Sequence, residues 1–188
     1  MKIRESGMPP QDVWDLFFDT DGILDRLGLD GSVTDAVEFG CGYGTFTLPA
    51  ANRLSGRVLA LDIEPEMLAI ATRNAVNAGV SNIDFSLRDF VGEGTGLPDE
   101  SVDFAMMFNI LHLLDPVSLL REALRVLKSD GRLGIIHWNH DEETPRGPPL
   151  SIRPTAERCI EWALAAGFSG ASEILDLPPY HYGMVLRR

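Results

Sequence analysis

The chain has 188 residues, of which 45% are hydrophobic and 23% are charged, ordinary proportions for one globular domain. Its formal net charge of −12 at pH 7 argues against a protein that holds DNA or RNA by the phosphates, because such binding needs clustered Lys and Arg. It contains no long uncharged apolar run, so we expect no membrane-spanning helix.

Two cysteines, Cys41 and Cys159, are too few for a disulfide scaffold and suit a reducing compartment. Residues 1–7 lack the apolar core of a signal peptide. We therefore expect a cytoplasmic protein that does not associate with membranes.

The N-terminal segment, residues 1–32, is expected to form a helical cap ahead of the first strand. Between Pro9 and Leu29 it places apolar side chains, among them Trp14 and Phe17, in an otherwise acidic stretch. Such a segment either folds over a ligand as a lid or packs on the sheet as an ordinary helix. Residues 33–188 are expected to form a single globular unit.

From residue 33 onward, strand and helix signals alternate almost without interruption. Apolar β-rich runs predict strands over residues 33–39, 58–62, 83–87, 102–108, 132–138, 171–177 and 181–186. Spacing and end signals predict helices over residues 45–54, 116–128 and 155–166, and another from Glu64-Pro65-Glu66 to Ala78-Gly79. The alternation predicts an α/β fold in which helices cover both faces of a mostly parallel sheet.

The first strand ends in the turn Gly40-Cys41-Gly42-Tyr43-Gly44, with glycine at alternate positions before a helix. Glycine accepts a left-handed backbone and brings bare N–H groups close to a ligand. An ordinary tight turn is the alternative interpretation. Ligands of parallel sheets bind beyond the carboxyl ends of the strands, where the strand order reverses, and this turn is expected to lie there.

Two acids follow the next two strands at the same predicted edge. Asp62 closes the second strand about 20 residues after the turn, where an acid can accept both ribose hydroxyls; a helix N-cap is its alternative role. Asp89-Phe90 follows the third strand, and suits an adenine whose amino group donates to the carboxylate while the ring packs on the base. Together with the turn, these residues predict an adenosine site.

Four segments, spread in order over about residues 33–139, resemble the successive motifs of class I S-adenosylmethionine-dependent methyltransferases. They are Glu38 to Gly44, Leu61 to Leu68, Leu87 to Asp89 with Leu97 to Asp103, and Leu120 to Leu133. The resemblance implies a three-layer Rossmann-like sandwich with a seven-stranded, mostly parallel sheet whose last strand is antiparallel. It also implies methyl transfer, with S-adenosylmethionine as the cofactor and S-adenosylhomocysteine as its product.

The family's cofactor residues fall on matching positions of this sequence. The positions implied to contact the cofactor are Glu38, Gly40, Gly42, Gly44, Asp62, Ile63, Asp89, Phe90 and Asn109. The family's amino-group enzymes for nucleic acids and some proteins use Asn-Pro-Pro and an aromatic after the fourth strand. Here Asn109-Ile110-Leu111-His112 stands in that place, which favours the small-molecule branch.

His112 and His137 are the candidate catalytic residues, because both are expected near carboxyl ends of strands. A general base is needed only if the acceptor begins protonated, and a structural role is the alternative for each histidine. His137 and His140, with the acids that follow, lack the spacing of a zinc motif, so no metal is expected.

The candidate substrate residues are Arg146, Arg153 and Tyr180, which follow the fifth strand. Two arginines in a proline-rich loop can clamp a carboxylate or phosphate, whereas solvation or pairing with the acids at 141–143 is the alternative. Because the sequence has no sizeable added domain, we expect a small-molecule acceptor and no nucleic-acid partner. A homodimer is compatible with the sequence.

The expected activity is therefore methyl transfer that depends mainly on holding donor and acceptor in line. A non-catalytic sensor or partner subunit that binds the cofactor is the alternative, since the cofactor motifs do not distinguish the two. A nicotinamide oxidoreductase would share the glycine turn and ribose acid. However, no tyrosine here has a lysine four positions later, as short-chain dehydrogenases require.

Overall fold

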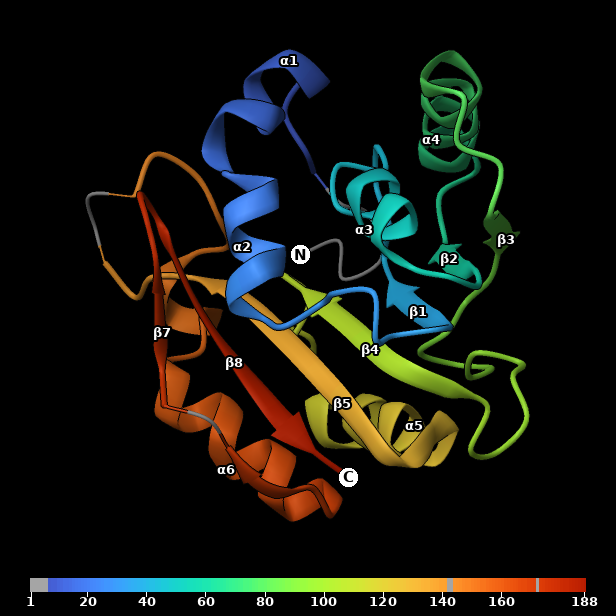
Figure 1. Ribbon diagram of the computed structural model, residues 1–188. Helices are drawn as coiled ribbons and strands as arrows, with labels where there is room; N and C mark the ends of the chain where they lie inside the picture. Colours follow the sequence, from blue (N-terminus) through green and yellow to red (C-terminus); the bar gives the residue numbers. More distant parts are fainter. Residues whose placement is uncertain (1–6, 142–143, 172) are drawn as a thin grey trace.

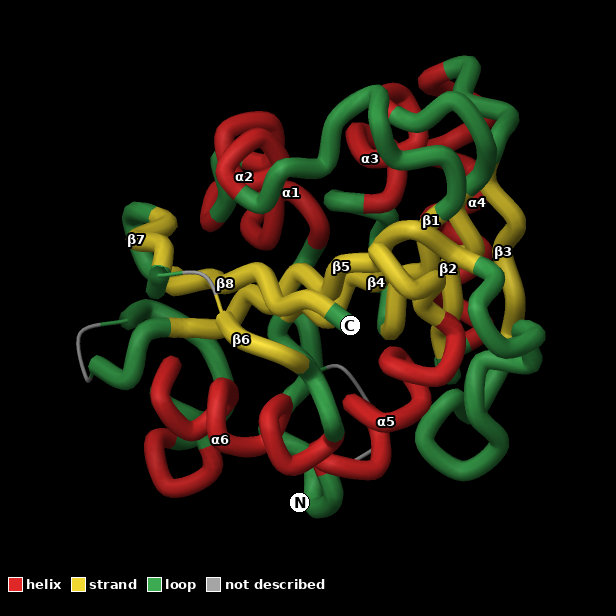
Figure 2. Tube along the Cα trace, turned by 60° about the horizontal axis from the view of Figure 1, so that its bottom comes forward, coloured by secondary structure: helices red, strands yellow, loops and turns green. Residues whose placement is uncertain are grey.

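A computed structural model of the chain describes residues 7–141, 144–171 and 173–188. It has three layers, with a central sheet between two groups of helices (Figures 1 and 2). One face of the sheet carries α1 (Gln11–Trp14), α2 (Thr20–Arg26), α3 (Thr47–Arg53) and α4 (Pro65–Ala78). The other face carries α5 (Pro116–Val126) and α6 (Ala156–Ala166). The predicted α/β sandwich is confirmed.

The sheet has the strand order β3-β2-β1-β4-β5-β8-β6, and β7 pairs with β8. Its strands are β1 (Ala36–Phe39), β2 (Val58–Asp62), β3 (Ile83–Leu87), β4 (Val102–Phe108), β5 (Leu127–Trp138), β6 (Ser169–Ala171), β7 (Leu175–Leu177) and β8 (His181–Arg187). The first five pair in parallel, whereas β8 runs antiparallel to β5 as expected. The described part of the chain has eight strands rather than seven, because the predicted strand 171–177 is divided into β6 and β7.

The strand order reverses beside β1, since β2 and β3 continue the sheet on one side and β4 and β5 on the other. The carboxyl ends of these parallel strands therefore meet at one edge, which is where α/β proteins bind their ligands. The turn that follows β1 lies at this reversal, as the sequence predicts.

Two element boundaries differ from the sequence prediction for identifiable reasons. The first strand begins at Ala36 rather than Val33, because the backbone N–H groups of Thr34 and Asp35 donate to the carboxylate of Asp103 instead of joining the ladder. The helix predicted to reach Lys128 ends at Val126, because Leu127 is already extended and pairs with Val102. In contrast, α4 has proline in its first turn and Gly79 at its left-handed end, as predicted.

Three hydrophobic clusters of the described residues fill the spaces between the layers. The largest joins α5 and α6 to the sheet through residues such as Leu120 and Ala163. The second joins α2 and α3 to the opposite face through residues such as Leu24 and Ala50, and a small third cluster joins α4 to β2 through residues such as Leu68. Two short 3-10 helices, η1 (Asp15–Phe17) and η2 (Leu150–Ile152), lie in the connections. The cores hold the sheet rigid, so its carboxyl edge is a fixed platform.

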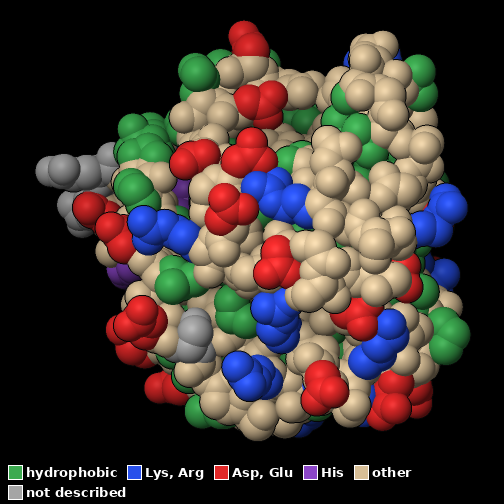
Figure 3. Space-filling model, viewed as in Figure 1, with side chains coloured by type: hydrophobic (Ala, Val, Ile, Leu, Met, Phe, Trp, Pro, Cys, Tyr) green, Lys and Arg blue, Asp and Glu red, His purple; other side chains and the backbone are tan. Residues whose placement is uncertain are grey.

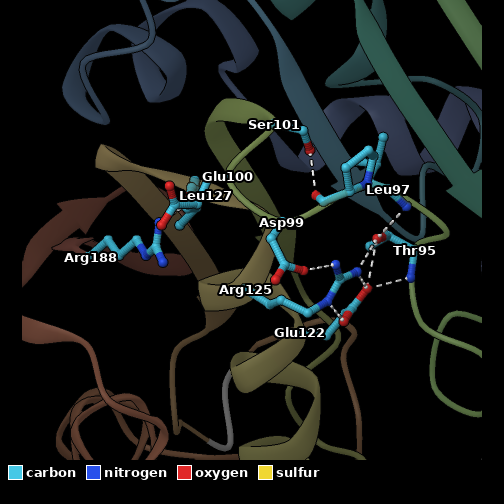
Figure 4. Close-up of polar contacts among 10 residues, drawn as sticks. Thr95, Leu97, Asp99, Glu100, Ser101, Glu122, Arg125, Leu127 and Arg188 are labelled. Carbon is cyan, nitrogen blue, oxygen red and sulfur yellow. Dashed lines mark hydrogen bonds and ion pairs between the residues drawn. The ribbon is translucent and has the colours of Figure 1, made fainter.

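A polar network fastens the long loop between β3 and β4 to α5 (Figure 4). Glu122 Oε1 accepts from both the backbone N–H and the hydroxyl of Thr95, at 2.7 Å each. The Arg125 guanidinium contacts Glu122 at 2.7 Å and Asp99 at 2.6 Å. This network ties the loop to the helix.

On the face drawn in Figure 3, basic side chains are interspersed with acidic ones rather than gathered into one patch. Over α2 and α3, for example, Arg53 pairs with Asp21 at 2.7 Å and with Asp25 at 3.0 Å. Among the residues that the structure describes, no helix is both long enough and apolar enough to cross a membrane.

Candidate functional site

The turn after β1 needs glycine at three positions. Gly40, Gly42 and Gly44 have φ angles of 79°, 53° and 82°, a region that side chains other than glycine rarely adopt. The N–H groups of Gly40 and Cys41 both donate to the carbonyl of Leu61, at 2.9 Å each. The turn is thus anchored to β2, and its bare backbone lies at the carboxyl edge.

The surroundings of the three glycines differ. A Cβ at Gly40 would lie 3.3 Å from Ile110 and 3.8 Å from Phe90, so this residue faces the loops after β4 and β3. A Cβ at Gly44 would lie 2.7 Å from the Leu48 side chain. Gly44 therefore allows close packing of the turn on α3, whereas Gly40 borders the space between three loops.

Asp62 connects the turn to the end of β2. Its carboxylate accepts from the N–H of Gly42 at 2.8 Å and from the N–H of Glu64 at 2.9 Å, and only 6% of the residue is exposed. Burial raises the pKa of Asp62, although the hydrogen bonds from Glu64 and Gly42 oppose this shift. Asp62 is not the helix N-cap that the sequence left as its alternative role, because Glu64 is the N-cap of α4 and the bond from Glu64 to Asp62 is a local turn. The bond from Gly42 directs the carboxylate toward the glycine turn.

Asp89 and Phe90 lie in the loop after β3. The Asp89 carboxylate accepts from the N–H of Gly92 at 3.1 Å, and the Phe90 ring meets Phe39 edge-on with 5.7 Å between centroids. Ile63, next to Asp62, is half-buried. Phe90 therefore lies beside Gly40, although the two residues are fifty positions apart in the sequence.

Glu38 is buried in β1 behind the turn and accepts a hydrogen bond from the Thr47 hydroxyl at the start of α3. Burial raises the pKa of this carboxyl to about 8, although the Thr47 bond opposes the shift and nearby Asp62 adds to it. Glu38 thus fastens the strand before the turn to the helix after it and is itself only 2% exposed.

On the other side of β1, polar atoms without hydrogen-bond partners gather at the ends of β4 and β5. Among the described residues, the buried and unpaired side-chain polar atoms are Asn109 Oδ1, His112 Nδ1 and both ring nitrogens of His137 and of His181, which pairs with Trp138 across β5 and β8. Asn109 has a φ of 61° and donates its N–H to the carbonyl of Ile136 at 2.8 Å. The rings of His112 and His137 are 5.6 Å apart, so the two candidate bases are neighbours.

Both imidazoles are held neutral at pH 7. Burial lowers the pKa of His112, and burial lowers the pKa of His137 well below the usual value, with the nearby His112 adding to the effect. A neutral imidazole has one acceptor nitrogen and one donor N–H. The pair therefore presents both kinds of hydrogen-bonding group at this edge.

The three candidate substrate residues lie around the end of β5 but have different surroundings. Arg146 is exposed, whereas Arg153 is buried and, among the described residues, its side chain donates to loop carbonyls and the Thr144 hydroxyl. Because its donors are used within the loop, Arg153 cannot clamp an anion as the sequence suggested. Residues 142 and 143, offered as partners for these arginines, lie outside the described residues. The Tyr180 ring packs on the rings of Phe17 and Trp138, with 6.0 and 6.3 Å between ring centroids.

The sequence did not reveal that the N-terminal segment touches the glycine turn directly. A Cβ at Gly42 would lie 3.0 Å from Met8 Sδ, and the Tyr43 hydroxyl donates to the carbonyl of Pro9 at 3.0 Å. The Thr45 hydroxyl donates to Asp15 at 2.8 Å. No local pattern announces these contacts, since they join residues about 30 positions apart.

A groove of about 430 Å³ separates the N-terminal segment from α3 and α4. Its walls include Gln11, Asn52 and Asn74, and also Gly44 of the glycine turn, but none of Asp62, Asp89 or Asn109. Of the candidate cofactor residues, the groove therefore touches only the end of the turn.

Residues 37–135, from β1 into β5, match a family model described as a methyltransferase domain. An uncharacterized methyltransferase-like protein of Schizosaccharomyces pombe is 28% identical over 158 residues, 80% of this chain and 58% of that protein. The ubiquinone biosynthesis O-methyltransferase of Xanthomonas oryzae pv. oryzae is 31% identical over 135 residues, 70% of this chain and 52% of that protein. The chain spans about half to three fifths of the length of these relatives.

Solved structures also resemble the fold. A SAM-dependent methyltransferase from Aquifex aeolicus is 25% identical with a TM-score of 0.82, over 95% of this chain and 98% of that chain. The cyclase SpnF is 23% identical with a TM-score of 0.73, over 98% of this chain and 85% of that chain. This second likeness concerns the fold alone, because the same architecture carries different chemistries.

Proposed function

Because the chain belongs to the class I S-adenosylmethionine-dependent methyltransferases, we propose that it transfers a methyl group from this cofactor to a small-molecule acceptor. When bound, S-adenosylmethionine supplies an electrophilic methyl group on a sulfonium. The name of the Xanthomonas relative supports an oxygen atom as the acceptor. The lack of a sizeable insertion between the motifs supports a small acceptor over a folded macromolecule.

The residues at the carboxyl edge fit this cofactor. Half-buried Gly40 and buried Gly42 have left-handed backbone there, and Asp62 accepts from the N–H of Gly42. A carboxylate has about four acceptor positions, so Asp62 can take ribose hydroxyls in addition to its two backbone donors. Asp89 would accept from the adenine amino group, with Ile63 and Phe90 against the base. Glu38 would act behind the turn through Thr47.

The proposed binding site for the methyl acceptor rests on the buried, unpaired polar atoms of Asn109, His112 and His137. Leaving a buried polar group unpaired costs about 1–3 kcal/mol, which a polar ligand would recover. The left-handed backbone of Asn109 adds local strain of a kind found at binding sites. We assign these residues to the acceptor and to the methionine end of the cofactor.

The residues present two contributions to catalysis. Holding donor and acceptor in line supplies roughly 7–11 kcal/mol of barrier reduction. If the acceptor is a hydroxyl, a neutral imidazole of His112 or His137 would accept its proton, a contribution of roughly 10²–10⁴-fold. The proton would then lie on a ring nitrogen of that histidine.

We assign residues 1–32 to a cap, of which residues 7–32 are described. Its second half packs on the sheet, because Ile23, Leu24 and Leu27 are buried in the core. Its first half contacts the glycine turn through Met8, Pro9 and Asp15. This division supports a lid role for the first half, and slower amide exchange of residues 8–15 on cofactor binding would test it.

The proposed activity is tested in two steps. Calorimetry with S-adenosylhomocysteine measures cofactor binding, and labelled methyl groups from S-adenosylmethionine are followed into a panel of phenols, carboxylates, amines and thiols. We expect micromolar binding and transfer to at least one oxygen acceptor. Transfer should fall at least hundredfold in His112→Gln or His137→Gln, with cofactor affinity within threefold of the wild type.

His140→Gln is the matched control, because His140 is exposed and contacts the carbonyl of Leu150 at 3.2 Å. It should transfer methyl groups at the wild-type rate. Failure to bind S-adenosylhomocysteine would contradict the proposal. Binding without transfer to any acceptor class would contradict the catalytic part and favour a cofactor-binding sensor instead.

A further inference from the structure

Arg153 forms an unusual set of contacts for a charged side chain with 8% exposure. Its Nη1 donates to the carbonyls of Asn139 at 2.8 Å and Asp141 at 3.1 Å, and also to the Thr144 hydroxyl. Its Nη2 donates to the carbonyls of Arg146 at 3.2 Å and Pro148 at 2.8 Å, and Nε to Pro148 at 3.1 Å. One guanidinium thus cross-links most of the loop between β5 and η2.

This loop is pressed against the end of β5. Gly147 has a φ of 106°, and a Cβ at this position would lie 2.8 Å from Trp138 Cγ and 3.0 Å from Arg153 Nη2. The exposed peptide at Gly147 therefore lies close to both the indole and the guanidinium, and a side chain there would meet both. Trp138 is 1% exposed and follows His137 directly in the strand, so the loop's position and that of the strand end are coupled.

Pro154, which follows Arg153, connects this loop to the residues around His137. Its carbonyl accepts from the Tyr182 hydroxyl at 3.0 Å, and the Tyr182 ring stacks on His137 with 6.3 Å between centroids and 23° between planes. Arg153 therefore contacts the loop, and the adjacent Pro154 contacts Tyr182, whose ring lies beside His137.

We propose that Arg153 is a positioning residue of the acceptor site: it cross-links residues 139–141 to residues 144–148 and, through the adjacent Pro154–Tyr182 contact, sets the position of His137. This inference rests on the proposed function, which assigns His137 to the acceptor. A planar guanidinium has five donors in a fixed fork, whereas an ammonium has three on one atom. The number and spread of the acceptors in the loop therefore require the donors of a guanidinium, and a positive charge alone is not sufficient.

The test compares the full-length wild type with Arg153→Gln, Arg153→Lys and Arg158→Gln. Arg158 is a matched control, because it lies nearby on the surface of α6 and pairs only with exposed Glu161 at 2.7 Å among the ion pairs described. Three readouts are amide exchange of residues 139–152, the ring resonances of His137 assigned with His137→Gln, and calorimetric affinity for S-adenosylhomocysteine.

In Arg153→Gln we expect at least tenfold faster exchange in the loop, displaced His137 resonances and cofactor affinity within twofold of the wild type. Arg153→Lys should show at least threefold faster exchange, and Arg158→Gln none. If the glutamine variant does not fold, the lysine variant decides. Wild-type exchange in the lysine variant, or unmoved His137 resonances in either variant, would overturn the role of Arg153. Failure of the wild type to bind S-adenosylhomocysteine would instead contradict the proposed function.

Discussion

The backbone N–H of Gly42 donates to Oδ2 of Asp62 at 2.8 Å, so the glycine turn after β1 and the acid after β2 form one unit. The same carboxylate accepts from Glu64 at the start of α4. Three chain segments therefore depend on one side chain. This arrangement links the shape of the turn to the residue that we assign to the ribose.

Replacing Asp62 by Asn should weaken the affinity for S-adenosylhomocysteine by about 10- to 100-fold, because hydrogen bonds to a charged group contribute about 1.5–3 kcal/mol. Calorimetry measures the change. Asp84→Asn is the control, since Asp84 is an exposed acid on β3 that pairs with Arg57 at 2.6 Å. Unchanged affinity in Asp62→Asn would exclude this carboxylate from the cofactor site.

Asp89 should determine the preference for adenine. The wild type is expected to bind S-adenosylhomocysteine at least tenfold more tightly than its inosine analogue, which lacks the amino group that donates to a carboxylate. Asp89→Asn keeps an oxygen for the loop contact with Gly92 and should reduce this preference below threefold. Competition binding of the two ligands checks it; an undiminished preference in the variant would contradict the assignment.

Glu38 should make the protein less stable as the pH rises. Its pKa is about 8 in the folded chain because it is buried, whereas the unfolded value is near 4.5. The folded state therefore holds more protons between these two values, so the free energy of unfolding falls as pH increases through the window. Glu38→Gln should remove at least about 1.4 kcal/mol of the fall between pH 5 and 8, equivalent to one pKa unit.

Urea unfolding at several pH values measures this difference. Glu66→Gln is the matched control, since Glu66 is an exposed acid in the first turn of α4. It should leave the pH dependence unchanged. An equally steep fall in Glu38→Gln would show that another group titrates.

The Glu122–Arg125 network should have the opposite dependence on pH. Burial acts to raise the pKa of Glu122, but hydrogen bonds from Arg125 and Thr95 outweigh it and lower the pKa to about 2. Its contribution to stability is therefore complete above about pH 4.5 and is lost as the pH falls toward 2. Glu122→Gln should cost about 2 kcal/mol at pH 7, measured by urea unfolding.

Glu161→Gln provides the comparison for that prediction. Its ion pair with Arg158 has the same 2.7 Å distance but lies on the surface, with both side chains about 60% exposed. Its loss should cost less than about 0.5 kcal/mol. Equal costs for the two variants would contradict a special role for the network at Thr95.

The sequence was sufficient to predict the parallel core of the fold. The signals for β1 to β4 and the helices between them are hydrophobic periodicity, glycines and helix-end residues, and all of these act within short stretches of chain. Gly79 at the end of α4 is one such signal, and its left-handed backbone is as expected. It was less reliable where long-range contacts override local preference. Leu127 looks helical by spacing, yet it extends because Val102 offers a strand partner.

For the candidate site, the sequence by itself determined that Gly40, Asp62, Asp89 and Asn109 follow successive strands, and a parallel sheet necessarily brings such positions to one edge. Only the tertiary structure decided what these residues contact. In the folded chain, Met8 lies against Gly42, the side-chain N–H groups of Arg153 donate to its own loop, and the Tyr182 ring stacks on His137. The physical reason is that spacing along a chain encodes which edge a residue reaches. Hydrogen bonds and ring contacts between distant residues instead depend on how the whole core packs.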